Sequence, residues 1–249
     1  MATTTAAVPE APQQHIGAFG RVIGAIINPR PTFEDIARKP SWLLPLLLLI
    51  ILSLSITALF GKRVGWRAFM EKQLAQNSRV QQMTPEQREN LVNQQVKFAP
   101  IFGYAFGVIG FPIITLVVAA IFMGIFNATS SAALDFKTSF GVVTHSYMPF
   151  VIASLLGVLI LYLKPPDQID LQNLVASNAG TFLSSDAPKW LLSLCTSLDL
   201  FTFWVLGLMA FGYSAVRPKK IKFGSALTWI GGIWLAFVLV KVGIAAMFS

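Results

Sequence analysis

An acidic and a basic side chain lie deep inside long apolar stretches of this sequence, where charged groups are rare. Asp199 lies in the fourth apolar run and Lys241 in the fifth. Charges in the hydrocarbon of a membrane are costly, so such residues are usually paired or functional. At 1.5 Å per helical residue, Asp199 lies roughly 15 Å below the start of its run and Lys241 roughly 12 Å from the C-terminal end of its own. Because these two ends share a membrane face, we expect an intramembrane ion pair.

This pair has two interpretations. In the functional one, Asp199 and Lys241 form a proton or ion relay, and Asp199 is the coupling group of a transporter or channel component. In the structural one, pairing lowers the cost of burying both charges and fixes the docking of the last two helices. We see no internal repeat or broken helix of the kind that transporters use. The structural interpretation therefore leads.

His145 lies about one turn inside the third apolar run. It is the candidate for a pH-sensitive group, because histidine titrates near neutral pH. The alternative is a histidine whose hydrogen bonds are satisfied at the interface. His15 is remote in the sequence, and no spacing of Cys, His and carboxylate residues indicates a metal site. We expect no metal and no cofactor.

Signatures of enzymes are missing. No Walker loop, dinucleotide fingerprint, nucleophile elbow or His-Glu-x-x-His motif occurs. A hydrolase made of Ser146, His145 and Asp199 would need an acid that lies at a different depth from the other two residues. The sequence therefore predicts a protein that is not an enzyme.

Five long apolar runs must position these residues. They are residues 41–60, 100–126, 141–163, 189–214 and 224–248. A helix needs about 20 mostly apolar residues to cross roughly 30 Å of hydrocarbon, and a 249-residue chain has no core that would hide five such helices. With 55% hydrophobic and 12% charged residues, the sequence predicts an all-α polytopic membrane protein. Its single domain, residues 15–249, is a bundle of five transmembrane helices.

Residues 1–14 are rich in Ala, Thr, Pro and Gln and are expected to form a disordered tail. The net charge of +8 does not indicate nucleic-acid binding, because the basic residues cluster beside the apolar runs and do not alternate with exposed aromatic residues. There we expect them to orient the helices and to contact anionic lipid headgroups.

An odd number of spans places the two termini on opposite sides of the membrane. The N-terminal segment carries Arg21, Arg30, Arg38 and Lys39, and the densest basic stretch, residues 217–222, lies on the same side. Since basic connections favour the cytoplasm, we expect the N-terminus in the cytoplasm and the C-terminus outside. The long first connection dissents, because it is also basic and this orientation puts it outside.

A short amphipathic segment precedes the first span. Apolar side chains recur at helical spacing through residues 16–27 and predict a helix in the membrane interface. Next come Asn28, Pro29, Arg30 and Phe33. These four residues are candidates for a partner site at the cytoplasmic interface. Alternatively, they only steer the chain from the interface helix into the first span.

The connections contain further helix signals. Thr84, Pro85 and Gln87 predict a helix start with a capping box. The third connection carries a weaker amphipathic stripe, Leu171, Leu174, Val175 and Phe182. This stripe predicts either an interfacial or re-entrant helix, or a loop helix that covers the bundle.

Several short motifs occur in a fixed order along the chain. They are residues 28–33 with Ile36 and Pro40, then 140–149, 173–180 and 197–204. Together they resemble the Yip-domain (Ypt/Rab-interacting protein) family, and its bacterial members most closely, over roughly residues 16–248. The resemblance implies a five-helix bundle with a cytoplasmic N-terminus, located in a bacterial inner (plasma) membrane.

Eukaryotic members of that family bind Rab-type GTPases and one another. The Asp-Leu-aromatic-Gly-Pro motif that those relatives carry near the membrane is absent here, which argues against carrying Rab-type GTPase binding over to this chain. The sequence thus predicts a non-enzymatic integral membrane protein that organises membrane or recruits partners, either other membrane proteins or further copies of itself. The alternative is the transporter or channel component that uses Asp199.

Overall fold

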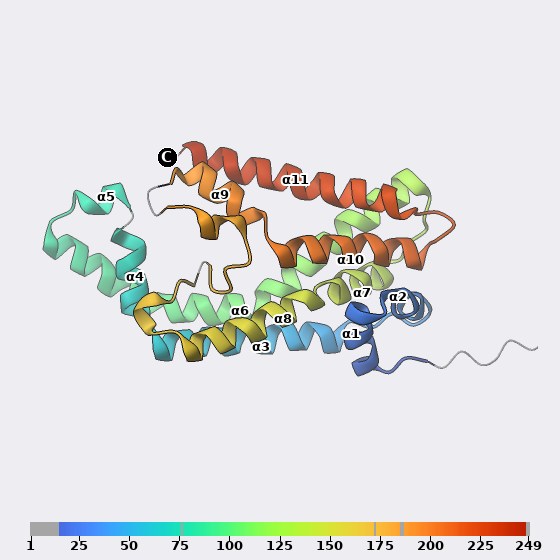
Figure 1. Cartoon of the computed structure of the whole chain (residues 1–249), viewed down its shortest axis with the longest axis horizontal. Coiled ribbons are helices and arrows are strands. Elements are labelled where there is room, and N and C mark those ends of the chain that lie inside the picture. Colours follow the sequence, from blue (N-terminus) through green and yellow to red (C-terminus); the bar gives the residue numbers. More distant parts are fainter. Residues whose placement is uncertain (1–14, 76, 172, 185–186, 248–249) are drawn as a thin grey trace, which may run out of the picture.

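The computed structural model describes residues 15–75, 77–171, 173–184 and 187–247, and this part of the chain consists of helices and connecting loops, without a β-strand (Figure 1). The helices in chain order are α1 (Ala18–Ile27), α2 (Pro29–Arg38), α3 (Leu43–Arg63), α4 (Trp66–Ala75), α5 (Ser78–Gln81), α6 (Pro85–Ser130), α7 (Phe136–Ser146), α8 (Met148–Leu163), α9 (Lys189–Ser197), α10 (Leu200–Val216) and α11 (Phe223–Met247). Two short 3-10 turns, η1 (Pro166–Gln168) and η2 (Ala179–Phe182), lie in the third connection. The predicted disordered tail and residue 248, the end of the last predicted span, lie outside the described residues.

Four helical stretches among the described residues are long and apolar enough to cross a membrane: α3, α6, α7 continued by α8, and α11. They pack into an elongated bundle (Figure 1). Helix α6 has 46 residues, so it is roughly 69 Å long and extends well beyond a bilayer core of roughly 30 Å. The prediction of an all-α polytopic membrane protein is confirmed.

The fourth predicted span is a broken helix. Helix α9 ends at Ser197 and α10 begins at Leu200. Both pieces pack against α11, and together they run along most of its length (Figure 1). The expectation of unbroken spans is therefore wrong here. The chain turns because the Asp199 side chain caps α10, while the backbone on either side of Asp199 pairs with the third connection.

The buried core is concentrated at one end of the bundle, near α1 and α2. There Tyr213 of α10 is fully buried, with its ring 4.8 Å from that of Phe126. The Ser139 hydroxyl donates to the carbonyl of Ala119 at 2.7 Å, so the Tyr213 hydroxyl donates to Ser139 at 2.6 Å. Toward the opposite half of the bundle lie two cavities, of about 700 and 470 Å³.

The helix predicted before the first span is confirmed as α1, and its two faces differ. Arg21 and Ala25 are buried against the bundle, while Phe19, Ile23 and Ile27 are exposed. An exposed apolar face next to membrane-spanning helices is typical of a helix that lies in the lipid interface.

One of the two connection predictions is confirmed. At the start of α6, the Gln87 amide donates to the Thr84 hydroxyl at 3.2 Å, and the Thr84 amide donates to the Gln87 side chain at 3.0 Å. The third connection, by contrast, is mostly irregular loop with η1 and η2, and the amphipathic helix predicted there is wrong. Its segment around Asn178 forms an antiparallel bridge with Asp199 instead.

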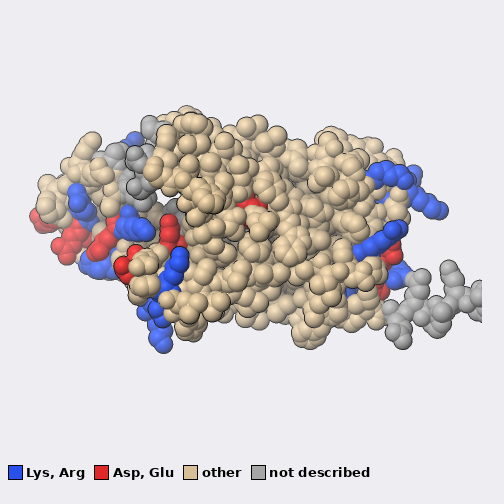
Figure 2. Space-filling model, viewed as in Figure 1, with Lys and Arg blue, Asp and Glu red and all other residues tan. Residues whose placement is uncertain are grey.

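The described chain begins and ends at opposite ends of the bundle (Figure 1). We call the end with α1, α2 and the α10–α11 turn the N-side face, and the end with α4, α5 and the C-terminus of α11 the C-side face. Charged residues gather at both faces, and the surface between them is almost free of charge in the view of Figure 2. This uncharged belt is the part of the surface that suits lipid.

Candidate functional site

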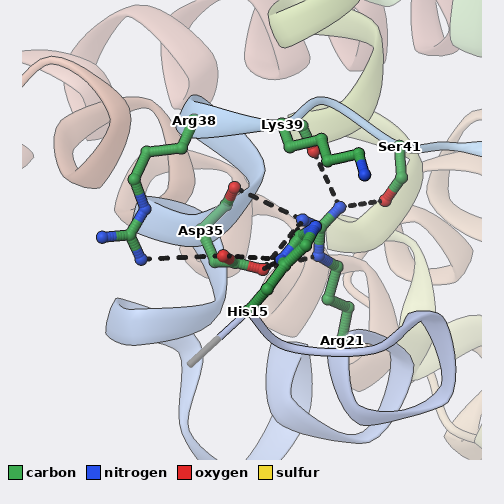
Figure 3. Close-up of polar contacts among 6 residues, drawn as sticks. All are labelled: His15, Arg21, Asp35, Arg38, Lys39 and Ser41. Atoms are coloured by element: carbon green, nitrogen blue, oxygen red, sulfur yellow. Dashed lines mark hydrogen bonds and ion pairs between the residues drawn. The ribbon is translucent and has the colours of Figure 1, made fainter. Parts of the chain in front are cut away.

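A buried ion pair joins α1 to α2 at the N-side face (Figure 3). Arg21 and Asp35 are each only 3% exposed. Arg21 Nε donates to Asp35 Oδ2 at 2.8 Å, and Nη2 lies 2.8 Å from the same oxygen. A buried charge needs such a partner, because an unpaired one costs several kcal/mol.

The rest of this cluster ties the ion pair to its surroundings. Arg21 Nη1 donates to the carbonyl of Lys39 at 2.8 Å and to the Ser41 hydroxyl at 2.5 Å. His15 Nδ1 lies 3.1 Å from each Asp35 carboxylate oxygen, and Arg38 Nη2 lies 3.6 Å from Oδ1. The cluster therefore fixes α1, α2 and the entry to α3 against one another (Figure 3).

The protonation of Asp35 follows from these contacts. Burial alone would raise the pKa of Asp35, but the hydrogen bond and positive charge of Arg21, together with His15, outweigh burial and hold the pKa below its ordinary value of 3.8. The carboxylate is therefore ionised at neutral pH, and the ion pair is intact.

The structure separates the four residues predicted as a partner site. Asn28 and Arg30 are exposed and Pro29 is half-buried. Arg30 pairs with Glu34 at 3.1 Å on the outer face of α2. Phe33 is fully buried. It cannot belong to an exposed partner site.

Phe33 packs against Gly212 of α10, where an added Cβ would lie 2.9 Å from the ring. This contact shows why Phe33 points inward, since it anchors α2 to the bundle.

His145 is fully buried in α7. Its Nδ1 lies 2.8 Å from the carbonyl oxygen of Gly141, one turn earlier. A carbonyl oxygen only accepts, so Nδ1 carries the proton of the neutral ring. This arrangement matches the interpretation of a histidine satisfied by its surroundings, and its pH sensitivity stays a prediction.

Asp199 holds the break between α9 and α10. Its Oδ1 accepts from the amide and the hydroxyl of Thr202, at 2.8 and 3.1 Å. Its Oδ2 accepts from the hydroxyl of Ser177 in the third connection. The backbone bridge adds two bonds, from the Ala179 amide to the Leu198 carbonyl at 3.2 Å and from Leu200 to Ser177 at 3.1 Å.

The predicted ion pair between Asp199 and Lys241 is not formed among the described residues. Lys241 lies beside the break, as its depth predicts, but its Nζ donates to the Ser197 hydroxyl at 3.1 Å. The carboxylate of Asp199 is instead used for capping α10 and for holding Ser177. The predicted pair assumed that both groups lie in continuous helices, whereas the break brings the Ser177 hydroxyl and the Thr202 amide to the carboxylate.

A cavity of about 470 Å³ reaches Asp199. The third connection forms one wall, where the Asn178 side chain donates to Asn173 at 2.8 Å and accepts from the Gly180 amide at 3.0 Å. Gly180 is needed at this point, because a Cβ there would lie 2.7 Å from the Thr196 side chain. The third connection thus closes tightly onto α9 while leaving an open space beside α10.

Two features of these sites were not predicted, the break between α9 and α10 and the Arg21–Asp35 ion pair. The break had a local signal, since Asp199 followed three residues later by Thr202 is an N-cap pattern. The Arg21–Asp35 pair had no local signal other than an arginine within the apolar pattern of residues 16–27. Only the packing of α1 on α2 brings its two partners together.

The described residues contain no group of three His, Cys, Asp or Glu side chains that could hold a metal ion. Comparison with curated proteins and with solved structures gives no match. The family model of the Yip1 domain matches residues 23–247. This match covers nearly all of the helical bundle, and the resemblance seen in the sequence motifs agrees with it. The chain therefore belongs to the Yip1 domain family.

Proposed function

We propose that this protein is a non-enzymatic scaffold that organises the membrane or recruits partners at its N-side face. The proposal rests on the observation that α1 and α2 form one unit held against the bundle. The buried Arg21–Asp35 pair holds it to the bundle, while exposed apolar side chains of α1 and the exposed Arg30 face outward. A rigid unit with one lipid-facing and one polar face suits a membrane-bound docking surface.

The charge of the N-side face supports a cytoplasmic position for it, in the plasma or inner membrane. The α10–α11 turn contributes Arg217, Lys219, Lys220 and Lys222, and basic connections favour the cytoplasm. A pocket of about 200 Å³ lies between this turn and α2, lined by Arg30, its partner Glu34 and Lys222 among others. Acidic groups of a partner or of lipid headgroups suit such a surface.

Site-specific photocrosslinking in native membranes tests the scaffold. A photoreactive residue replaces Asn28, with and without Arg30→Ala. We expect discrete crosslinked products at the N-side face that decrease with Arg30→Ala. The matched control is Arg67→Ala, since Arg67 forms the same exposed pair with Glu71, at 3.0 Å, near the C-side face. Products that are absent, or that respond equally to both substitutions, would exclude a partner site at Arg30.

One observation favours a second candidate, a transporter or channel component. The fourth span is broken, and a cavity reaches Asp199 at the break, as in transporters that bind substrate at discontinuous helices. Proteoliposomes test this directly. Proton or cation flux that is lost in Asp199→Asn supports transport, whereas wild-type vesicles as tight as protein-free ones exclude it.

A further inference from the structure

The cavity at Asp199 lies deep in the membrane-spanning part of the bundle. Helix α10 has 17 residues between Asp199 and the N-side turn, which places the carboxylate roughly 26 Å from that face. Helix α9 has nine residues on the other side of the break, or roughly 14 Å. Asp199 is therefore well within the hydrocarbon depth, where an ionised carboxylate is costly unless a positive charge balances it.

Among the described residues, no basic side chain lies within ion-pair distance of this carboxylate. The nearby Lys241 donates to Ser197 instead. The N-terminus of α10 contributes only a partial charge. The carboxylate of Asp199 is thus held by hydroxyl and amide donors and not by an ion pair, so a bound cation would be its first ion-pair partner among the described residues.

A second aspartate that caps a helix shows that capping does not by itself require a cavity beside the carboxylate. Asp135 caps α7 as Asp199 caps α10, with the Thr138 amide and hydroxyl at 2.9 and 2.7 Å from its carboxylate. Asp135 lies at the N-side face, where Arg217 binds the carbonyls of residues 132 and 133 just before it. Of these two capping aspartates, Asp199 is the one that lines a cavity of the described residues.

The lining of the cavity indicates which cation fits. Besides Asp199, the lining residues include Phe111, Phe150 and Phe201, together with polar residues of the third connection such as Ser177 and Asn178. Aromatic rings together with a carboxylate are typical of sites for organic ammonium groups. The volume, about 470 Å³, lies in the usual range of roughly 300–1,000 Å³ for small-molecule sites, far above that of one bare ion.

We propose that this cavity binds an organic ammonium group, with the Asp199 carboxylate as its counter-charge and the phenylalanine rings around its apolar substituents. The inference goes beyond the scaffold and needs no transport. The ammonium group belongs either to a soluble amine or to the headgroup of an amine-bearing phospholipid, since both present the same chemistry to the cavity.

Choline titration of the purified full-length protein tests the site. The protein is placed in nanodiscs of phosphatidylglycerol, which has no amine, and binding of choline and of its neutral isostere 3,3-dimethyl-1-butanol is measured by calorimetry. We expect saturable choline binding and at least tenfold weaker binding of the isostere. Equal affinities, or no saturable choline binding, would overturn the proposal without any variant.

Variants then assign the counter-charge. Asp199→Asn should weaken choline binding at least tenfold, and it keeps the cap because Asn also accepts from the Thr202 amide. Asp135→Asn, the matched control, should change the affinity less than twofold. Wild-type affinity in Asp199→Asn, at an unchanged melting temperature, would overturn the role of the carboxylate.

Phosphatidylethanolamine identifies the source of the group. If nanodiscs of this lipid weaken choline binding relative to phosphatidylglycerol, the cavity takes the lipid headgroup. If the affinity is unchanged, it takes a soluble amine. Both results support recognition of an ammonium group. Stronger competition by potassium ions than by ethanolamine would overturn it in favour of an inorganic cation site.

Discussion

The buried pair at the N-side face gives the most direct prediction. Replacing Arg21 with Met removes its ion pair with Asp35 and its bonds to Lys39 and Ser41. Breaking a buried pair costs about 3–5 kcal/mol. Because Arg38 remains 3.6 Å from the carboxylate, we expect a loss near the lower end, about 3 kcal/mol.

Hydrogen–deuterium exchange of the α1 amides in nanodiscs measures this loss. A decrease of about 3 kcal/mol in local opening free energy corresponds to roughly 150-fold faster exchange. The matched control is Arg30→Met, which breaks the exposed pair with Glu34 on the neighbouring helix and should change exchange less than about threefold, since such pairs contribute under about 0.5 kcal/mol.

A second comparison separates pairing from packing. Replacing both partners, Arg21→Met with Asp35→Leu, leaves no unpaired buried charge and should restore much of the protection, because apolar replacements of buried pairs are often neutral. If Arg21→Met alone accelerates exchange no more than Arg30→Met, the ion pair does not hold α1 to the bundle.

Three further predictions concern other contacts. Because the pKa of Asp35 is lowered below 3.8, its stabilising effect is complete above that value and is lost as the pH falls through the lower folded value. The protection of the α1 amides, corrected for intrinsic exchange, should therefore decrease as the pH falls below 4. Gly212→Ala should destabilise the protein by about 1–3 kcal/mol in detergent unfolding, since its Cβ would lie 2.8 Å from the Val142 side chain, whereas Gly207→Ala, with nothing within 4 Å, should not; equal effects would contradict the packing described for α10. Asp199→Asn and Lys241→Met should be additive in the same assay within about 0.5 kcal/mol, and a larger coupling would show that the two charges do pair.

The spans were predictable because the requirement of a bilayer is simple. A run of about 20 apolar residues has few alternatives to a membrane-crossing helix. The capping box at Thr84 was equally local, since its hydrogen bonds join residues three positions apart. Long apolar runs and the capping box were therefore predictable from neighbouring residues, whereas the weaker amphipathic stripe of the third connection was not.

The site depended on distant contacts, and there the sequence was less informative. Depth along a helix predicted that Lys241 lies close to the break, but it did not predict the partners. Ser197 accepts from Lys241, while Ser177 donates to Asp199. Phe33 belongs to the motif of residues 28–33, but its ring is buried in the core, where Gly212 leaves space for it. The pattern of apolar and charged residues predicted where along the bundle these residues lie. Their contact partners depended on how distant segments pack.

The uneven packing of the bundle has a mechanical consequence. Closely packed interiors resist compression, and here they fill mainly the N-side half, while spaces of about 700 and 470 Å³ remain toward the opposite half. We therefore expect the half of the bundle in one leaflet to be stiffer than the half in the other. Tension or thinning of the membrane should then deform the C-side half more readily than the N-side half.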